Sequence, residues 1–171
     1  MFRISHFFQA TAAAAVLFAA SHANAQSNSL TAAQAMAAAM AVQDYAKKEG
    51  SDPSTAVLDR DGNVVLLLKG NNAAPHNIGL AQRKAFTANM FKMKSIEWRD
   101  ATKTGTSRAS ERETPNAIPL GGGVPIMVGN EIVGAVGVSG TKGGQEGDTA
   151  GAQAGADAAA AVAASRPVAQ N

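Results

Sequence analysis

Two β-hairpin patterns lie far apart in the chain, and neither alternates with helices in the way that a parallel sheet requires. The first is "TAVLDRDGNVVLLLK", where two β-rich runs flank Asp61 and Gly62, a dipeptide that accepts the backbone angles of a tight turn. The second is "VPIMVGNEIVGAVGVSG", which turns at Gly129 and Asn130. Because hairpins pair antiparallel strands, this order predicts an α+β fold with helices on an antiparallel sheet, not a doubly wound fold.

Helical patterns precede and separate the hairpins. Thr31 and Gln34 have the spacing of a capping box, and the helix that they open is expected to stop at Gly50. A second helix is expected from Asn77, as its cap, to about Met93. Its apolar spacing predicts an inner face of Ile78, Ala81, Ala85, Phe86 and Met90.

Two more helices complete the pattern. A short one is expected over 95–98, and an alanine-rich helix over 148–165 closes the domain. The polar residues 103–117 are predicted to form a mobile loop.

Residues 1–25 have the pattern of a secretory signal peptide. Arg3 supplies a positive charge, "HFFQATAAAAVLFAAS" is an apolar run too short for a comfortable membrane span, and Ala23–Ala25 form a small-residue cleavage site. We therefore expect a periplasmic or secreted protein with one domain over 26–165 and a disordered tail, 166–171. No other stretch is apolar enough to cross a bilayer.

The mature chain would have no cysteine and little net charge. The absence of cysteine excludes thiol catalysis, iron–sulfur clusters and covalent attachment of haem through C-x-x-C-H. Loss of Arg3 lowers the formal net charge of +2 by one, so nothing steers the protein towards nucleic acid or an anionic membrane. An exported chain without disulfides must be held together by packing, with help from oligomerisation.

The motifs of common enzyme classes are absent. Neither "LGGGVPI" nor "GAVGVSGTKGGQEG" matches a dinucleotide-binding or P-loop pattern. Ser139 lacks the G-x-S-x-G context of a hydrolase nucleophile, and one histidine without cysteine is a poor basis for a zinc site. Gly134 and Gly137 fall inside a predicted strand, where glycine indicates a bulge or the close approach of another backbone or a flat ligand.

His76 is the histidine that would remain after cleavage, and it follows Pro75 at the start of a predicted helix. One interpretation is a loop histidine that hydrogen-bonds the backbone near the helix start. The other is an axial ligand of haem iron, which needs one protein nitrogen and an apolar slot. Methionines suit such a slot, although methionine at helical spacing is usually core: Met36, Met40, Met90, Met93 and Met127. The residues alone leave both interpretations open.

From Leu30 to Gly155 the sequence contains, in order, "LTAAQA", "AVLDRDGNVV", "APHNIGLAQRKAFTA", "IPLGGGVPI", "VGAVGVSG" and "DTAGAQAG". These segments resemble, at the same relative positions, the GlcG/HbpS-like haem-binding family, which includes the C-terminal domain of PduO-type proteins. The resemblance implies a profilin-like antiparallel sheet of about five strands with helices on its faces. It also implies homo-oligomers, as dimers or multiples of dimers, and haem binding in some members.

Within this resemblance, His76 and Asn77 occupy the positions where "PH" and a small polar residue open the central helix. We expect His76 to supply an axial nitrogen to haem iron. Arg83, about two turns along the helix, and Lys84 beside it are the candidates to pair with a haem propionate. The alternative for both bases is an ordinary surface or interface ion pair.

Two positions depart from the family pattern: Gly151 stands where a cysteine is frequent, and Thr149 where an acidic residue is. Roles tied to those side chains do not transfer. The leading hypothesis is an exported, oligomeric, non-catalytic haem-binding protein for storage, scavenging or redox sensing. One alternative is a non-haem accessory subunit of a periplasmic glycolate or alcohol oxidation system. Another is an enzyme that degrades haem or handles a small acid.

Overall fold

The computed structural model describes residues 30–165, so the predicted signal peptide and C-terminal tail lie outside the described residues. In chain order the elements are α2 (Ala32–Lys48), β1 (Ser54–Asp59), β2 (Val64–Leu68), α3 (Asn77–Phe91), α4 (Ser95–Ala101), the 3-10 helix η1 (Ala109–Glu113), β3 (Gly123–Val128), β4 (Glu131–Ser139) and α5 (Gly144–Ala164). Within this range no helix is long and apolar enough to cross a membrane.

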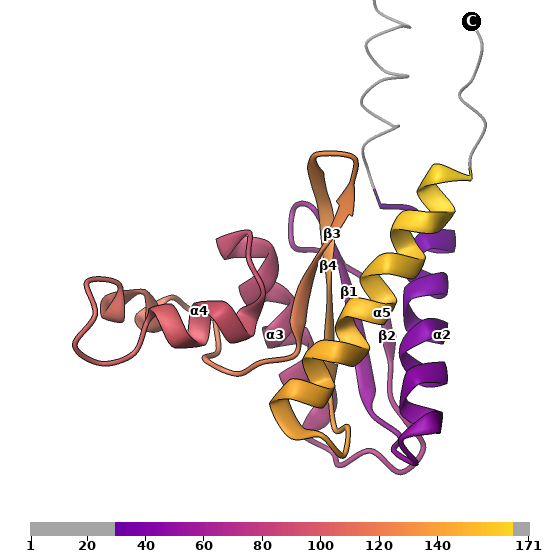
Figure 1. Ribbon diagram of the computed structural model, residues 1–171, viewed down its shortest axis with the longest axis horizontal. Coiled ribbons are helices and arrows are strands. Elements are labelled where there is room, and N and C mark those ends of the chain that lie inside the picture. Colours follow the sequence, from indigo (N-terminus) through magenta and orange to yellow (C-terminus); the bar gives the residue numbers. More distant parts are fainter. Residues whose placement is uncertain (1–29, 166–171) are drawn as a thin grey trace, which may run out of the picture.

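The strands form one antiparallel sheet in the order β2-β1-β4-β3. Helices α2 and α5 pack side by side on one face, and α3 covers the other (Figure 1). This arrangement confirms the predicted α+β class. The expected count of about five strands is too high, because the described residues form a four-stranded sheet and the long segment before β3 folds into turns and η1.

The ends of two helices test the capping predictions. Thr31 and Gln34 form the predicted capping box at the start of α2, and Gly50 adopts a positive φ of 63° just beyond its end. The prediction for α3 is wrong by one residue. His76 occupies the N-cap position without a side-chain hydrogen bond, and Asn77 is already helical. The start of α3 therefore has no side-chain cap.

Helix α3 rests directly on the backbone of the sheet. Gly123 and Gly137 are paired across β3 and β4. A Cβ atom at Gly137 would overlap the carbonyl oxygen of Ala81 and the amide nitrogen of Ala85, and one at Gly123 would overlap the carbonyl of Lys84. Of the alternatives predicted for Gly137, a bulge or the close approach of another backbone or a flat ligand, the structure shows the close approach of another backbone, that of α3.

This contact also fixes which side of α3 faces inward. Ala81 and Ala85 are fully buried, as predicted, and Ile78 and Phe86 are half-buried. Met90 is 50% exposed, so its place on the inner face was predicted wrongly. Close approach to the glycines requires small side chains at the contact, and the larger ones are therefore left at its margin or outside it.

Helix α4 and η1 form an arm, residues 94–117, that projects from the sheet (Figure 1). Trp98 is fully buried at its base, stacks on Phe91 with ring centroids 4.6 Å apart, and donates its indole N–H to Glu111 at 2.9 Å. Hydrogen bonds from Arg108 and Trp98 lower the pKa of Glu111, although partial desolvation opposes the shift. The segment predicted as a mobile loop thus contains a folded turn with an ionic anchor.

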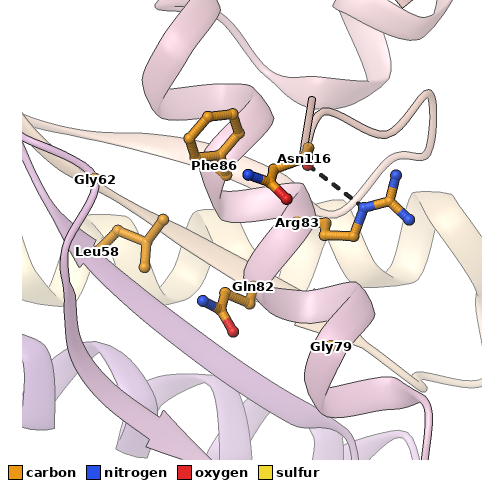
Figure 2. Close-up of a pocket in the computed structure, with 7 residues that line it drawn as sticks. All are labelled: Leu58, Gly62, Gly79, Gln82, Arg83, Phe86 and Asn116. Atoms are coloured by element: carbon orange, nitrogen blue, oxygen red, sulfur yellow. Dashed lines mark hydrogen bonds between the residues drawn. The ribbon is translucent and has the colours of Figure 1, made fainter. Parts of the chain in front are cut away.

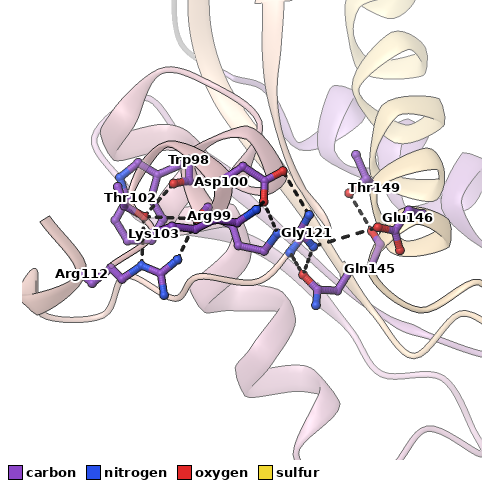
Figure 3. A network of polar contacts seen from close by, with 10 residues as sticks. All are labelled: Trp98, Arg99, Asp100, Thr102, Lys103, Arg112, Gly121, Gln145, Glu146 and Thr149. Carbon is purple, nitrogen blue, oxygen red and sulfur yellow. Dashed lines mark hydrogen bonds and ion pairs between the residues drawn. The ribbon is translucent and has the colours of Figure 1, made fainter. Parts of the chain in front are cut away.

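A second set of polar contacts joins the arm to α5 (Figure 3). The side-chain oxygen of Gln145 accepts hydrogen bonds from Arg99 Nη1 at 2.8 Å and from the backbone N–H of Gly121 at 2.7 Å. Hydrogen bonds from Arg99 and then Lys103 lower the pKa of Asp100 to about 2, so this exposed contact stays charged near neutral pH. Gln145 therefore links α4, the glycine-rich loop and α5 through one amide oxygen.

Candidate functional site

The exposed face of α3 carries the predicted haem ligand and one of its predicted partners. His76, Gly79, Arg83 and Phe86 are spaced by three or four residues and so share one side of the helix. His76 and Arg83 are exposed, and Phe86 is half-buried. The structure thus brings His76 and Arg83 onto the same face, about two helical turns apart.

A cavity of about 390 Å³ opens on this face of α3 (Figure 2). We call it the helix cavity; it is lined by Leu58, Gly62, Gly79, Gln82, Arg83, Phe86 and Asn116. A Cβ atom at Gly79 would meet nothing within 4 Å, so no other group covers the surface of α3 at this residue. His76 lies about one turn before Gly79 and outside the lining. The cavity therefore combines an apolar wall with amide and guanidinium groups, next to an exposed imidazole.

Arg83 is held at the rim of the helix cavity. Its Nη2 donates to the carbonyl of Ala117 at 2.8 Å. Its Nε donates to the carbonyl of Asn116 at 3.4 Å, and this second bond is drawn in Figure 2. Asn116 has a positive φ of 67°, a conformation that asparagine tolerates better than most residues. Nη1 has no hydrogen-bond partner among residues 30–165. The guanidinium is thus oriented by the backbone and keeps one nitrogen for an anion.

Lys84 has a different environment from the one expected for a propionate partner. It is 2% exposed, and its ammonium lies 2.6 Å from Asp148 Oδ2 and 3.1 Å from the carbonyl of Val138. An ammonium enclosed in this way is not available at the surface. The expected pairing of Lys84 with a propionate does not fit this geometry, and the residue instead ties α3 to β4 and α5.

Asp148 is the main polar residue that the sequence analysis missed. Its Oδ1 accepts hydrogen bonds from Gly140 N, Thr141 N and Thr141 Oγ1 at 2.8–3.1 Å, while Oδ2 faces Lys84. The available signal was one of only two aspartates, Asp148 and Asp157, in an otherwise alanine- and glycine-rich helix. A carboxylate with this many donors is a structural anchor of the loop between β4 and α5.

The exposed methionines do not converge on the helix cavity. Met36 and Met40 lie on α2, Met90 on α3 and Met127 on β3, and all four are 43–54% exposed. None of them lines the helix cavity. In the part of the chain that the structure describes, no group of three or more His, Cys, Asp or Glu residues could hold a metal ion.

The sequence profile of the "Haem degrading protein HbpS-like" family matches residues 30–157 of this chain. The chain belongs to this family. The predicted membership of the GlcG/HbpS-like group is thereby confirmed. It accounts for the fold and for the order of the glycine-rich segments.

Individual HbpS-like relatives agree with this assignment. Protein GlcG of Escherichia coli strain K12 is 35% identical over 108 residues, which cover 62% of this chain and 79% of GlcG. A crystal structure of a double mutant of HbpS from Streptomyces reticuli is 32% identical, with a TM-score of 0.69, over 75% of this chain and 86% of that one. The PduOC structure in complex with haem has a TM-score of 0.70 at 21% identity, over 76% and 94% of the two chains, and supports the fold alone.

Proposed function

We propose that this protein binds haem after export, with His76 as an axial ligand, and that it serves in haem storage, scavenging or redox sensing. The observation that carries the proposal is the exposed imidazole of His76 on the same face of α3 as the helix cavity. HbpS-like membership and the haem complex of a protein with this fold support a haem-related function.

The site has the groups that a haem requires. The imidazole of His76 makes no cap hydrogen bond and lies free at the helix start, and Phe86 and Leu58 give an apolar wall for the macrocycle. Arg83 could pair with a propionate through Nη1. At about 390 Å³ the cavity is at the lower end of the size range of ligand pockets, so the macrocycle would be held at its edge.

Replacing His76 by alanine tests the assignment. The variant is expected to lose the low-spin haem spectrum and to bind haemin at least tenfold more weakly, about 1.4 kcal/mol. Its melting temperature without haem should change little, because the imidazole makes no cap hydrogen bond. Haemin titration followed by absorbance measures both effects. Arg83→Gln is the matched variant: it should weaken binding and leave the spectrum of the bound haem unchanged. An unchanged spectrum in His76→Ala would place the axial ligand elsewhere.

Haem degradation is the second candidate, because the description of the family names it. Bound haem in the presence of a reductant and oxygen would then lose its Soret absorbance over repeated turnovers. A non-haem accessory role in glycolate or alcohol oxidation is the remaining alternative. Wild-type protein that gives no saturable haemin binding would favour it.

We also propose that the protein is a dimer or a multiple of dimers. Met36 and Met40 on α2 are each more than half exposed, and Val64 and Leu67 on the edge strand β2 are 43% and 46% exposed. Apolar side chains that stay exposed on the folded chain are candidates for burial between copies. Sedimentation at micromolar concentration should show a species of at least twice the mass of one chain. A single species at monomer mass across that range would contradict the proposal.

A further inference from the structure

A second cavity, distinct from the helix cavity, lies where three loops meet at one end of the sheet. We call it the loop cavity; it measures about 390 Å³ and is lined by Gly50, Ser51, Asp52, Asn72, Ala73, Ala74, Asn77, Gly140 and Lys142. These residues come from the loops after α2, after β2 and after β4, together with the first residue of α3. His76 and Arg83 do not line it.

Asn77 lines the loop cavity with a side chain that makes no hydrogen bond within the described residues. Asn77 as a whole is only 9% exposed. Among residues 30–165, neither the amide oxygen nor the amide nitrogen of this side chain has a hydrogen-bond partner. The amide is not fully enclosed, since the enclosed side-chain atoms without a partner in the described residues are Ser54 Oγ, Thr55 Oγ1 and Asn89 Oδ1. It is therefore accessible from the cavity and free to hydrogen-bond a ligand there.

Positive charge accompanies Asn77 at the loop cavity. Lys142 is exposed, its ammonium lies beside Gly50, and it forms no ion pair or hydrogen bond within the described residues. Asn77 is also the first residue of the 15-residue helix α3, so the positive end of the dipole of α3 lies at the cavity. The positive end of a helix dipole and an ammonium next to the same cavity favour an anionic group.

Asp52 limits which anions fit. Its Oδ2 accepts hydrogen bonds from the backbone and side-chain nitrogens of Asn72 at 2.8 and 3.3 Å. Oδ1 has no partner within the described range. A carboxylate on the wall repels a dianion and leaves an acceptor for a hydroxyl or ammonium group of the ligand.

We propose that the loop cavity binds a small monocarboxylate that carries a hydroxyl or ammonium group next to its carboxylate. Lys142 and the Asn77 amide hold the carboxylate, and Asp52 accepts a hydrogen bond from the second group. This function goes beyond haem binding, because it uses a cavity that neither His76 nor Arg83 lines.

Three probes of nearly equal shape separate the possible second groups. Lactate carries a hydroxyl, alanine an ammonium, and propionate neither. Titration into the ¹⁵N-labelled protein at neutral pH should give saturable amide shifts at Ala74, Asn77, Gly140 and Lys142 with lactate, alanine or both. Propionate should bind at least tenfold more weakly than the better of the two, and inorganic phosphate should give no saturable shift.

Variants then test the assigned residues. Lys142→Met and Asn77→Ala should each weaken the bound probe at least tenfold, whereas Lys103→Met, which removes a lysine charge on the arm, should not. Asn77→Ala should leave the melting temperature of the free protein nearly unchanged, because the amide makes no hydrogen bond within the described residues. If the role of Asn77 were purely structural, Asn77→Ala would lower the melting temperature of the free protein.

Several outcomes would overturn the proposal. They are wild-type protein that binds neither lactate nor alanine, propionate that binds as well as both, phosphate that competes, or affinity that survives both variants. The haemin titration is independent of these results. His76→Ala should keep its affinity for the small acid, and Asn77→Ala should keep its haemin spectrum, so that each function can fail without the other.

Discussion

Replacing Gly137 by valine is expected to prevent the chain from accumulating as a folded protein. A Cβ atom at this position would overlap backbone atoms of Ala81 and Ala85, and backbone atoms cannot rotate away as a side chain can. Helix α3 would have to move off β4 as a body and uncover the small core between them. Overpacking usually costs about 1–3 kcal/mol. We expect the cost of a clash with backbone atoms of two residues to lie at or above the upper end of that range.

A graded pair of alanine substitutions makes this result measurable. Gly137→Ala should lower the free energy of unfolding by about 2–3 kcal/mol, measured by denaturant titration. Gly79→Ala is the control on the same helix. A Cβ atom there meets nothing within 4 Å, and removing a helical glycine should raise stability by about 0.5–1 kcal/mol. A Gly137→Ala midpoint equal to that of the wild type would show that α3 does not rest on the sheet as described.

Lys84→Met is expected to cost about 3–5 kcal/mol of the free energy of unfolding, because it leaves the Asp148 carboxylate buried without its cation. The two side chains are 3% and 7% exposed, and methionine matches the four-atom aliphatic part of lysine without its ammonium group. A loss of this size is a large part of the roughly 5–15 kcal/mol that stabilises a typical domain. Denaturant unfolding followed by circular dichroism would measure it.

The double variant Lys84→Met/Asp148→Asn is the control for this effect. The asparagine oxygen can still accept from Gly140 N and Thr141 N, while no buried charge remains. We expect it to be more stable than Lys84→Met alone, so that the double-mutant cycle gives a coupling of more than about 1 kcal/mol. If the effects of the two substitutions on the free energy of unfolding were additive, the interaction between Lys84 and Asp148 would not contribute to stability.

Local signals explain what the sequence predicted well. Asp61-Gly62 and the Gly129 turn carry their turn chemistry within a few residues, and the structure has hairpins at both places. The Thr31–Gln34 capping box is also confirmed. Each of these features depends on neighbours along the chain, so a single sequence contains the information needed to predict it.

Long-range contacts explain what the sequence analysis missed. Lys84 and Asp148 are 64 residues apart, and only the assembled sheet brings the middle of α3 next to the start of α5. Before that contact is known, a lysine beside Arg83 on a helix resembles a surface base. The position of Asn77 in the loop cavity could not be predicted for the same reason, since the cavity is formed by loops from three parts of the chain. His76 and Arg83 remain predictions as haem-binding residues.

Trp98 is the one tryptophan of the sequence, and it lies at the base of the arm between Phe91 and Glu111. The intrinsic fluorescence excited at its absorption edge therefore has a single source, far along the chain from the β1–β2 hairpin. Its emission responds to how the arm sits on the end of α3, whereas far-ultraviolet circular dichroism averages over all helices and strands. Comparing the two signals during unfolding separates detachment of the arm from loss of the sheet, without any added label.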